Sequence, residues 1–222
     1  MILGASGDLA RKKTYPSLLE LYQHNLLPRK TVIWGFARTV KTHDELRDHL
    51  RPHLTINDNN NNHNDNNDDQ LPPLANPDKT VEQFLKMCFY HSGSSYGDGS
   101  AYERMLEGIK CAAAFSMTDA NLLYYLAIPP NVFHQTVKTL ERIPGAVVQS
   151  SSSGTTKFVI EKPFGRDTAS CQELLNSFKG LGEDMQYRLD HYLAVSLSSS
   201  SSSSSHLLIS SRSFISLDRV SL

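Results

Sequence analysis

The chain alternates between apolar blocks of strand length and segments whose apolar residues recur at helical spacing. Ile2-Leu3 is a short apolar stub that runs into a glycine, and a helical pattern then extends from Leu9 to Tyr22 and stops before Pro28. Further along, the pattern predicts buried strands over 31–36, 122–128 and 157–160 and a helix over 131–142. This order of elements predicts an α/β fold, a Rossmann-type doubly wound parallel sheet with helices on both faces.

Two further segments carry the signature of a capping box. Thr42 and Glu45, and again Ser100 and Glu103, have the spacing at which a hydroxyl and a carboxylate satisfy free amides of the first helical turn. We therefore expect one helix to begin directly after Thr42 and another directly after Ser100.

Three segments have a composition that is typical of chains without packed structure. Residues 57–69 are almost all asparagine and aspartate, residues 150–153 are serines, and residues 196–205 are nearly all serine. Such side chains bury too little apolar area to offset the entropy of ordering the chain. We therefore predict a disordered loop over 57–69 and a serine-rich tail without its own fold over 194–222.

Charge and composition exclude several classes of function. The 22 basic and 23 acidic residues leave a net charge of -1, so no global basic field would recruit nucleic acid. No apolar run approaches the roughly 20 residues of a membrane-spanning helix, and the first residues do not resemble a targeting peptide. Three widely separated cysteines fit no disulfide framework, which favours a reducing compartment. We expect no nucleic acid or membrane partner and a cytoplasmic location, with a plastid location left open.

A metal site is not expected either. His49 and His53 are four residues apart, as in a helical metal-binding pair. Pro52 breaks that helix, however, and no third ligand is apparent from the sequence.

A glycine-containing turn follows the first apolar stub and leads into a helix. It reads Gly4-Ala5-Ser6-Gly7-Asp8-Leu9-Ala10. In strand-turn-helix units, glycines allow a pyrophosphate to approach closely, and the free amides and the dipole of the helix N-terminus hold its charge. Because Ser6 stands where the middle glycine of G-x-G-x-x-G belongs, the spacing alone fits a dinucleotide site and an ordinary turn equally well.

The end of the second predicted strand indicates which dinucleotide would bind. An acidic residue at this point would select NAD by accepting a hydrogen bond from the ribose 2′-hydroxyl. Arg38 stands there instead, and its guanidinium suits a 2′-phosphate, to which Thr39 can add a hydroxyl. This favours NADP as the cofactor; the alternative is that Arg38 is a solvated surface charge.

Three segments, far apart in the chain, form a series in a fixed order. They are Gly4 to Ala10 followed by Lys12-Lys13, then Glu161-Lys162-Pro163-Phe164-Gly165-Arg166-Asp167, then Tyr187-Arg188-Leu189-Asp190-His191-Tyr192-Leu193. This series resembles three successive signatures of the glucose-6-phosphate dehydrogenases. Shorter likenesses at 26–28, 35–38 and 124–130 agree, so the resemblance covers residues 1–193.

The resemblance implies an activity and a set of site residues. Enzymes of that family transfer a hydride from the anomeric carbon of glucose 6-phosphate to NADP and release 6-phosphogluconolactone, in the oxidative pentose phosphate pathway. It implies that NADP is held by Gly4, Ala5, Ser6, Gly7, Asp8, Leu9, Ala10, Arg11, Arg38, Tyr125 and Lys162. It implies that Lys162, His191 and Tyr192 bind glucose 6-phosphate and that Asp190 orients the family's catalytic histidine.

The position of Lys162 agrees with that role, because it follows the strand predicted over 157–160. The carboxyl ends of parallel strands are where ligands of open α/β sheets bind. From the residues alone, the alternatives are a loop lysine paired with Glu161 and a surface pair formed by Asp190 and His191.

The chain also departs from the family pattern. Val195 stands where the family has a phosphate-binding lysine, and the family's catalytic histidine and dimer interface lie beyond this point. We therefore predict an NADP-binding domain over 1–180, only the start of the family's second α+β domain over 181–193, and a tail unlike the family over 194–222. The expected chain is a glucose-6-phosphate dehydrogenase fragment, inactive as written, from a family that forms homodimers or tetramers. The alternatives are a non-enzymatic or degenerate NADP-binding protein and a different Rossmann-type NADP oxidoreductase.

Overall fold

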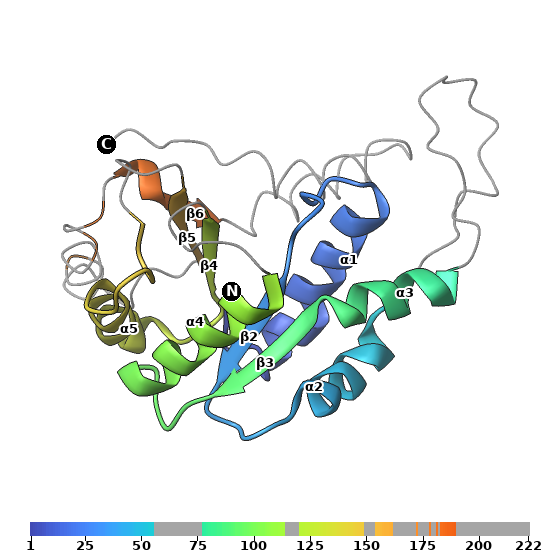
Figure 1. The fold of residues 1–222 in the computed structure, drawn as a ribbon, viewed down its shortest axis with the longest axis horizontal. Coiled ribbons are helices and arrows are strands. Elements are labelled where there is room, and N and C mark those ends of the chain that lie inside the picture. Colours follow the sequence, from blue (N-terminus) through green and yellow to red (C-terminus); the bar gives the residue numbers. More distant parts are fainter. Residues whose placement is uncertain are drawn as a thin grey trace.

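The computed structural model describes residues 1–55, 77–113, 120–148, 154–161, 172, 178, 181 and 183–189. Within them lies one six-stranded sheet, with the strand order β3-β2-β1-β4-β5-β6 (Figure 1). Its strands are β1 (Ile2–Leu3), β2 (Ile33–Ala37), β3 (Cys88–Ser92), β4 (Asn121–Leu126), β5 (Thr155–Glu161) and β6 (Gln186–Leu189). All neighbouring strands are parallel, which confirms the predicted doubly wound sheet.

Helices cover both faces of this sheet (Figure 1). One face carries α1 (Tyr15–Gln23), α2 (His43–Leu50) and α3 (Pro77–Lys86), and the other carries α4 (Gly99–Ala113) and α5 (Phe133–Glu141). Each helical layer packs on its own cluster of buried side chains. The adjacent residues Tyr124 and Tyr125 of β4 belong to opposite clusters, because successive side chains of a strand point to opposite faces.

The apolar pattern located most of these elements to within a few residues. The strands predicted over 31–36, 122–128 and 157–160 are β2, β4 and β5, and the helix predicted over 131–142 is α5, preceded by the 3₁₀ helix Pro130–Val132. The helical pattern from Leu9 to Tyr22 contains a feature that the sequence did not indicate, the π-helix Ala10–Thr14 before α1. The elements α3 and β3 have no counterpart among those predicted from the sequence.

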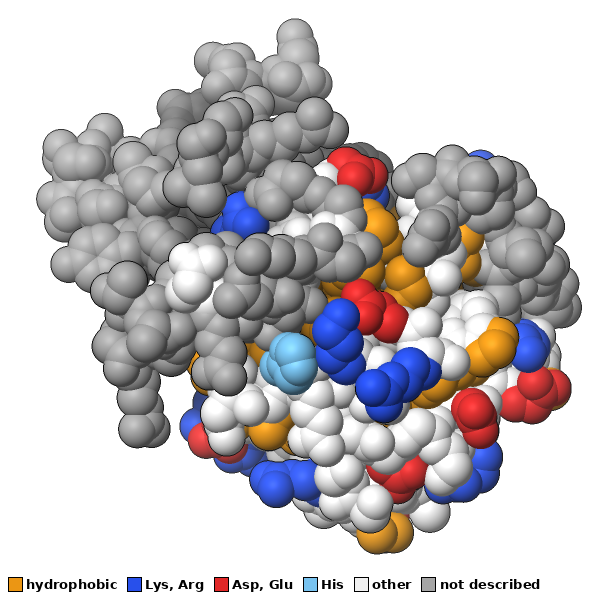
Figure 2. Space-filling model, turned by 90° about the vertical axis from the view of Figure 1, so that its left-hand side faces the viewer, with side chains coloured by type: hydrophobic (Ala, Val, Ile, Leu, Met, Phe, Trp, Pro, Cys, Tyr) orange, Lys and Arg blue, Asp and Glu red, His pale blue; other side chains and the backbone are white. Residues whose placement is uncertain are grey.

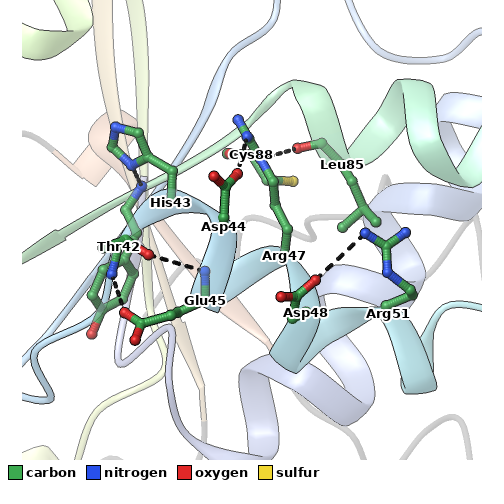
Figure 3. Close-up of polar contacts among 10 residues, drawn as sticks. Thr42, His43, Asp44, Glu45, Arg47, Asp48, Arg51, Leu85 and Cys88 are labelled. Carbon is green, nitrogen blue, oxygen red and sulfur yellow. Dashed lines mark hydrogen bonds and ion pairs between the residues drawn. The ribbon is translucent and has the colours of Figure 1, made fainter.

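The capping box predicted at the start of α2 is confirmed (Figure 3). The backbone N–H of Thr42 donates to the Glu45 carboxylate at 2.6 Å, and the N–H of Glu45 donates to Thr42 Oγ1 at 3.2 Å. Two free amides at the helix start are thus satisfied by two side chains that are three positions apart, so this helix start depends on local sequence alone.

Polar side chains of α2 also bind the segment around β3, the edge strand of the sheet (Figure 3). Arg47 Nε donates to the carbonyl oxygens of Leu85 at 3.0 Å and Cys88 at 3.2 Å. His43 Nδ1 accepts a hydrogen bond of 3.0 Å from the backbone N–H of Tyr90. Because these contacts occupy backbone groups of an edge strand, they leave fewer of them open to pairing with another chain.

The capping box predicted at Ser100 is wrong. Helix α4 begins at Gly99, so Ser100 lies inside it. Asp98 caps the helix, because its carboxylate accepts from the Ala101 N–H in the first turn. The Asp98 carboxylate accepts hydrogen bonds from the N–H and hydroxyl of Ser94, from the Ser100 hydroxyl and from the N–H of Ala101. A carboxylate accepts more bonds than a hydroxyl does, and it suits the positive end of the helix dipole.

Replacing Asp98 with alanine is expected to lower the melting temperature by about 2 to 4 °C, because α4 loses its cap. Its hydrogen bonds to Ser94 are the largest cause that holds the pKa of the Asp98 carboxyl below its usual value, followed by those to Ser100 and Ala101. The stabilisation is therefore complete above the unfolded-state pKa of about 3.9 and is lost as pH falls through the lower folded-state value. Thermal unfolding of the variant and the parent should thus converge in acid. Ser100→Ala is the matched control, and an equal loss in that variant would contradict the assignment.

Several sequence predictions concern other parts of the chain. The predicted loop over 57–69, the serines at 150–153 and the tail over 194–222 lie outside the described residues. Residues 186–189, which we placed at the start of a second domain, form β6 and pair with β5 in this sheet. The boundary after residue 180 stays a prediction. Among the described residues, no helix has the length and apolar character needed to cross a membrane.

Candidate functional site

The candidate site lies at the carboxyl ends of the central strands. β1 pairs with β2 on one side and with β4 on the other. The chain adds β2 and β3 on one side of β1 and then crosses over to add β4, β5 and β6 on the other side, so the strand order reverses at β1. In open α/β sheets, this reversal opens a crevice at the carboxyl edge in which ligands bind. The glycine turn that follows β1 stands at this point of the sheet.

Backbone hydrogen bonds fix the glycine turn against β2. The N–H groups of Gly4 and Ala5 both donate to the carbonyl of Phe36, at 2.8 and 3.2 Å. The N–H of Gly7 then returns to the carbonyl of Gly4 at 2.9 Å, and the N–H of Arg11 donates to the carbonyl of Gly7 at 3.2 Å. The turn therefore closes on itself and leads directly into the helix.

Gly4 brings this turn against the end of β4. Its φ of +89° lies in the left-handed region, which side chains rarely adopt. A Cβ atom at Gly4 would lie 2.1 Å from the carbonyl oxygen of Ala127. The two strands that border the crevice can approach this closely only because residue 4 has no side chain.

The outer residues of the turn are exposed and charged. Gly7, Asp8 and Leu9 face solvent, whereas Ala10 is buried. The Asp8 carboxylate lies 2.5 Å from an Arg11 nitrogen and 3.2 Å from Lys12 Nζ. Hydrogen bonds to Lys12 and Arg11 hold the pKa of Asp8 below its usual value. Arg11 and Lys12 are thus two cations that a ligand arriving from solvent would meet at the turn. Asp8 offsets part of their positive charge.

The end of β2 provides the polar side chains that the sequence predicted for the ribose. The exposed guanidinium of Arg38 lies over the ring of Tyr96, 5.8 Å from its centroid. The Ser6 hydroxyl donates to Thr39 Oγ1 at 3.3 Å, although the two residues are 33 positions apart, and the carbonyl of Thr39 accepts from the Tyr90 hydroxyl at 2.6 Å. Ser6 of the glycine turn and Thr39 after β2 therefore form one polar surface, beside Arg38.

Tyr125 lies on β4, with its side chain almost fully buried. Its hydroxyl donates to the Glu161 carboxylate at the end of β5. Burial, and next the bond to Glu161, raise the pKa of Tyr125 well above its usual value, so the hydroxyl stays protonated. One alternative from the sequence was that Glu161 pairs with Lys162 in a loop. The structure instead buries Glu161 and joins β4 to β5 through it.

Four of the predicted site residues, Lys162, Asp190, His191 and Tyr192, lie outside the described residues. The strands that precede them are described. Glu161 and Leu189 are register partners in the parallel pair of β5 and β6. The chain therefore leaves the same edge of the sheet at the same level immediately before Lys162 and immediately before Asp190.

The face shown in Figure 2 mixes acidic, basic and apolar side chains over the described residues, without a broad field of one sign. No group of three potential metal ligands occurs among the described residues. His49 and His53 lie at the end of α2 and in the 3₁₀ helix Arg51–His53 that follows it.

Comparison with known families bears on the identity of this site. Residues 1–197 match the family model described as glucose-6-phosphate dehydrogenase, NAD binding domain. The chain belongs to the glucose-6-phosphate dehydrogenase family. The matched residues contain all of the described sheet, so the dinucleotide-binding fold of the family is the fold observed here.

Individual glucose-6-phosphate dehydrogenases agree with this membership. The chloroplastic glucose-6-phosphate 1-dehydrogenase 1 of Arabidopsis thaliana is 40% identical over 197 residues, which are 88% of this chain and 31% of that protein. The Drosophila melanogaster enzyme is 34% identical over 194 residues, 87% of this chain and 32% of that protein. The chain thus spans about a third of the length of the curated relatives it matches.

Solved structures give the same result. A glucose-6-phosphate dehydrogenase in complex with its substrate glucose-6-phosphate superposes with a TM-score of 0.69 at 34% sequence identity. The superposition covers 87% of this chain and 36% of that one. The glucose-6-phosphate 1-dehydrogenase of Mycobacterium avium superposes with a TM-score of 0.64 at 27% identity, over the same shares of both chains.

Proposed function

We propose that this chain binds NADP and belongs to an enzyme that oxidises glucose 6-phosphate to 6-phosphogluconolactone. The observation that carries the proposal is the contact between the glycine turn and the end of β2, where Ser6 meets Thr39 at the carboxyl edge of the sheet. A dinucleotide lying across this contact would place its pyrophosphate on the turn and its adenosine ribose at Arg38 and Thr39.

The residues at the end of β2 favour NADP over NAD. Arg38, Thr39, Val40 and Lys41 follow the strand, so two cations and a hydroxyl stand where NAD-specific sites carry a carboxylate. The first acidic side chain after the strand is Asp44, whose carboxylate pairs with Arg47 at 2.8 Å on the surface of α2. A 2′-phosphate would therefore meet complementary charge without a competing carboxylate.

The sugar-phosphate site is proposed to form beside the nicotinamide, where the chain leaves β5 and β6. The register of Glu161 with Leu189 supports this position, because Lys162 and Asp190 are the next residues of the two strands. Lys162 would contact both cofactor and sugar, while His191 and Tyr192 would donate to the phosphate, as the family resemblance implies. When bound, NADP would supply the hydride acceptor.

The buried pair of Tyr125 and Glu161 would hold the strand ends beside the proposed cofactor and sugar sites in place. It joins the ends of β4 and β5, the strands that lead to Ala127 and Lys162. Its hydrogen bond would restrict the relative movement of two segments that must hold one ligand between them.

Location and assembly stay predictions. The names of several plant relatives describe those proteins as chloroplastic, which supports the plastid alternative to the cytoplasmic location that we expect. Homodimers or tetramers are implied by the family resemblance alone.

Titration of the purified 222-residue chain with NADP and with NAD tests the proposal. We expect NADP to bind at least about tenfold more tightly, since a charge-assisted hydrogen bond contributes about 1.5 to 3 kcal/mol. Equal affinity for both dinucleotides, or binding of neither, would refute the proposed cofactor site. Adding glucose 6-phosphate and following NADPH tests the expectation that the polypeptide is inactive as written. Turnover near the common enzymatic rate of about 10 per second would contradict that expectation and support the dehydrogenase activity.

A further inference from the structure

The loop that carries the proposed 2′-phosphate ligands is anchored by side chains of other elements. This loop, residues 38–41, connects the end of β2 to the cap of α2, and Arg38, Thr39 and Val40 within it are exposed. Within the described part of the chain, no backbone–backbone hydrogen bond involves these residues. A loop of this kind would sample many conformations unless side chains fix it, and a ligand that needs one conformation would then bind more weakly.

Tyr90 of β3 is a buried anchor of this loop, with 2% of its surface exposed. Its hydroxyl donates to the carbonyl oxygen of Thr39 at 2.6 Å. Its backbone N–H donates to Nδ1 of His43, the first residue of α2, at 3.0 Å. One residue of the neighbouring strand therefore holds both the loop at Thr39 and the helix start that follows the loop.

The Tyr90 ring lies beside Gly35, its register partner in β2. A Cβ atom at Gly35 would lie 3.2 Å from Tyr90 Cδ2 and 2.6 Å from the Cβ of Ala5 in the glycine turn. The absence of a side chain at Gly35 thus makes room for both the ring and the turn. Ser6 of the same turn donates to Thr39 Oγ1 at 3.3 Å. The Tyr90 hydroxyl therefore fixes the loop at the residue that meets the glycine turn.

We propose that Tyr90 is a positioning residue for NADP selectivity, whose hydroxyl holds the loop 38–41 so that Arg38 and Thr39 meet the 2′-phosphate. Tyr90 is buried and acts through the loop, whereas the exposed Arg38 guanidinium contacts the phosphate. This inference rests on the proposed function, because it explains how the residues proposed to bind the phosphate are placed. NAD lacks that phosphate, so its binding should depend little on the position of the loop.

Tyr90→Phe removes the hydroxyl and keeps the ring, and titration measures the dissociation constants of NADP and NAD for this variant and the parent chain. We expect Tyr90→Phe to weaken NADP about fivefold to tenfold and NAD less than about twofold, the effect of one lost hydrogen bond on a loop that only NADP needs. Tyr124→Phe is the matched control, because its buried hydroxyl also donates to a backbone carbonyl, that of Ala146, at 2.7 Å. This control should lower the melting temperature similarly and leave the ratio of the two affinities unchanged.

A double-mutant cycle shows whether Tyr90 acts through Arg38. In a chain that already carries Arg38→Ala, Tyr90→Phe should change NADP affinity by less than about twofold, because the group that the hydroxyl positions is absent. A purely structural role of Tyr90 would give the same fold loss with and without the Arg38 side chain, and that result would overturn the inference.

Val40→Gly tests the placement of the loop without changing the core. Val40 is 84% exposed, and glycine at this position gives the loop backbone more freedom. We expect this variant to weaken NADP more than NAD. Equal losses of NADP and NAD affinity, or no loss, in a folded Tyr90→Phe variant would overturn the inference. If Tyr90→Phe does not fold, as judged from its melting temperature, the same results for Val40→Gly would overturn it. Failure of the parent chain to bind NADP, or equal binding of both dinucleotides, would instead refute the proposed function.

Discussion

Replacing Gly4 with alanine is expected to abolish dinucleotide binding and to destabilise the fold by roughly 3 kcal/mol or more. The left-handed backbone of Gly4 costs a side-chain-bearing residue about 1 to 2 kcal/mol. The new Cβ would also lie 2.1 Å from the Ala127 carbonyl oxygen, so the turn or the end of β4 must shift, at a typical cost of 1 to 3 kcal/mol for overpacking. The shift would occur where the pyrophosphate is proposed to bind.

Thermal unfolding and NADP titration check this prediction. A loss of about 3 kcal/mol corresponds to a melting temperature lower by about 6 to 12 °C in a chain of this size. Gly99→Ala is the matched control, because the nearest atom to a Cβ there is Thr139 Cγ2 at 3.7 Å, an ordinary contact. If Gly4→Ala melted and bound NADP like that control, the turn would not have the tight approach described here.

Replacing Arg38 with alanine is expected to weaken NADP by about 1.5 to 3 kcal/mol, or roughly 10- to 150-fold, and to leave NAD nearly unchanged. The guanidinium is exposed at the end of β2, over the ring of Tyr96, and can form paired bonds to a 2′-phosphate that NAD lacks. Arg38→Lys keeps the charge but not the planar pair of donors, so an intermediate loss is expected.

Titration of both dinucleotides against the same proteins measures this effect. Arg142→Ala removes an exposed cation at the end of α5 and serves as the control for net charge. A similar loss of NADP and NAD affinity in Arg38→Ala would show that the residue supports the site without reading the 2′-phosphate, and the assignment of NADP would fail.

Features that depend on a few consecutive residues could be predicted from the sequence. Thr42 and Glu45 form the expected capping box, because both partners lie within one helical turn. The strands β2, β4 and β5 follow their apolar runs, since a strand buried on both faces must be apolar throughout. The glycine turn could also be recognised, because it consists of consecutive residues. Its spacing alone did not distinguish a ligand site from an ordinary turn.

Other features depended on which side chains and strands the folded chain brings into contact. Asp98 caps α4 in place of Ser100 because its carboxylate can accept from the Ser94 loop and the first turn together. Helix α3 and strand β3 were not identified, because no local signal that we used marked them, although the sheet places β3 beside β2. The burial of Glu161 likewise depends on Tyr125, a residue 36 positions away on the adjacent strand.

The sequence by itself therefore determined the fold class, the glycine turn and the cation at the end of β2. Only the tertiary structure decided that Ser6 meets Thr39 and that Gly4 packs against Ala127. The physical reason is the range of the interactions. Backbone conformation, capping and apolar periodicity act over a few residues and can be read along the chain, whereas a binding site forms where a parallel sheet brings distant strand ends to one edge.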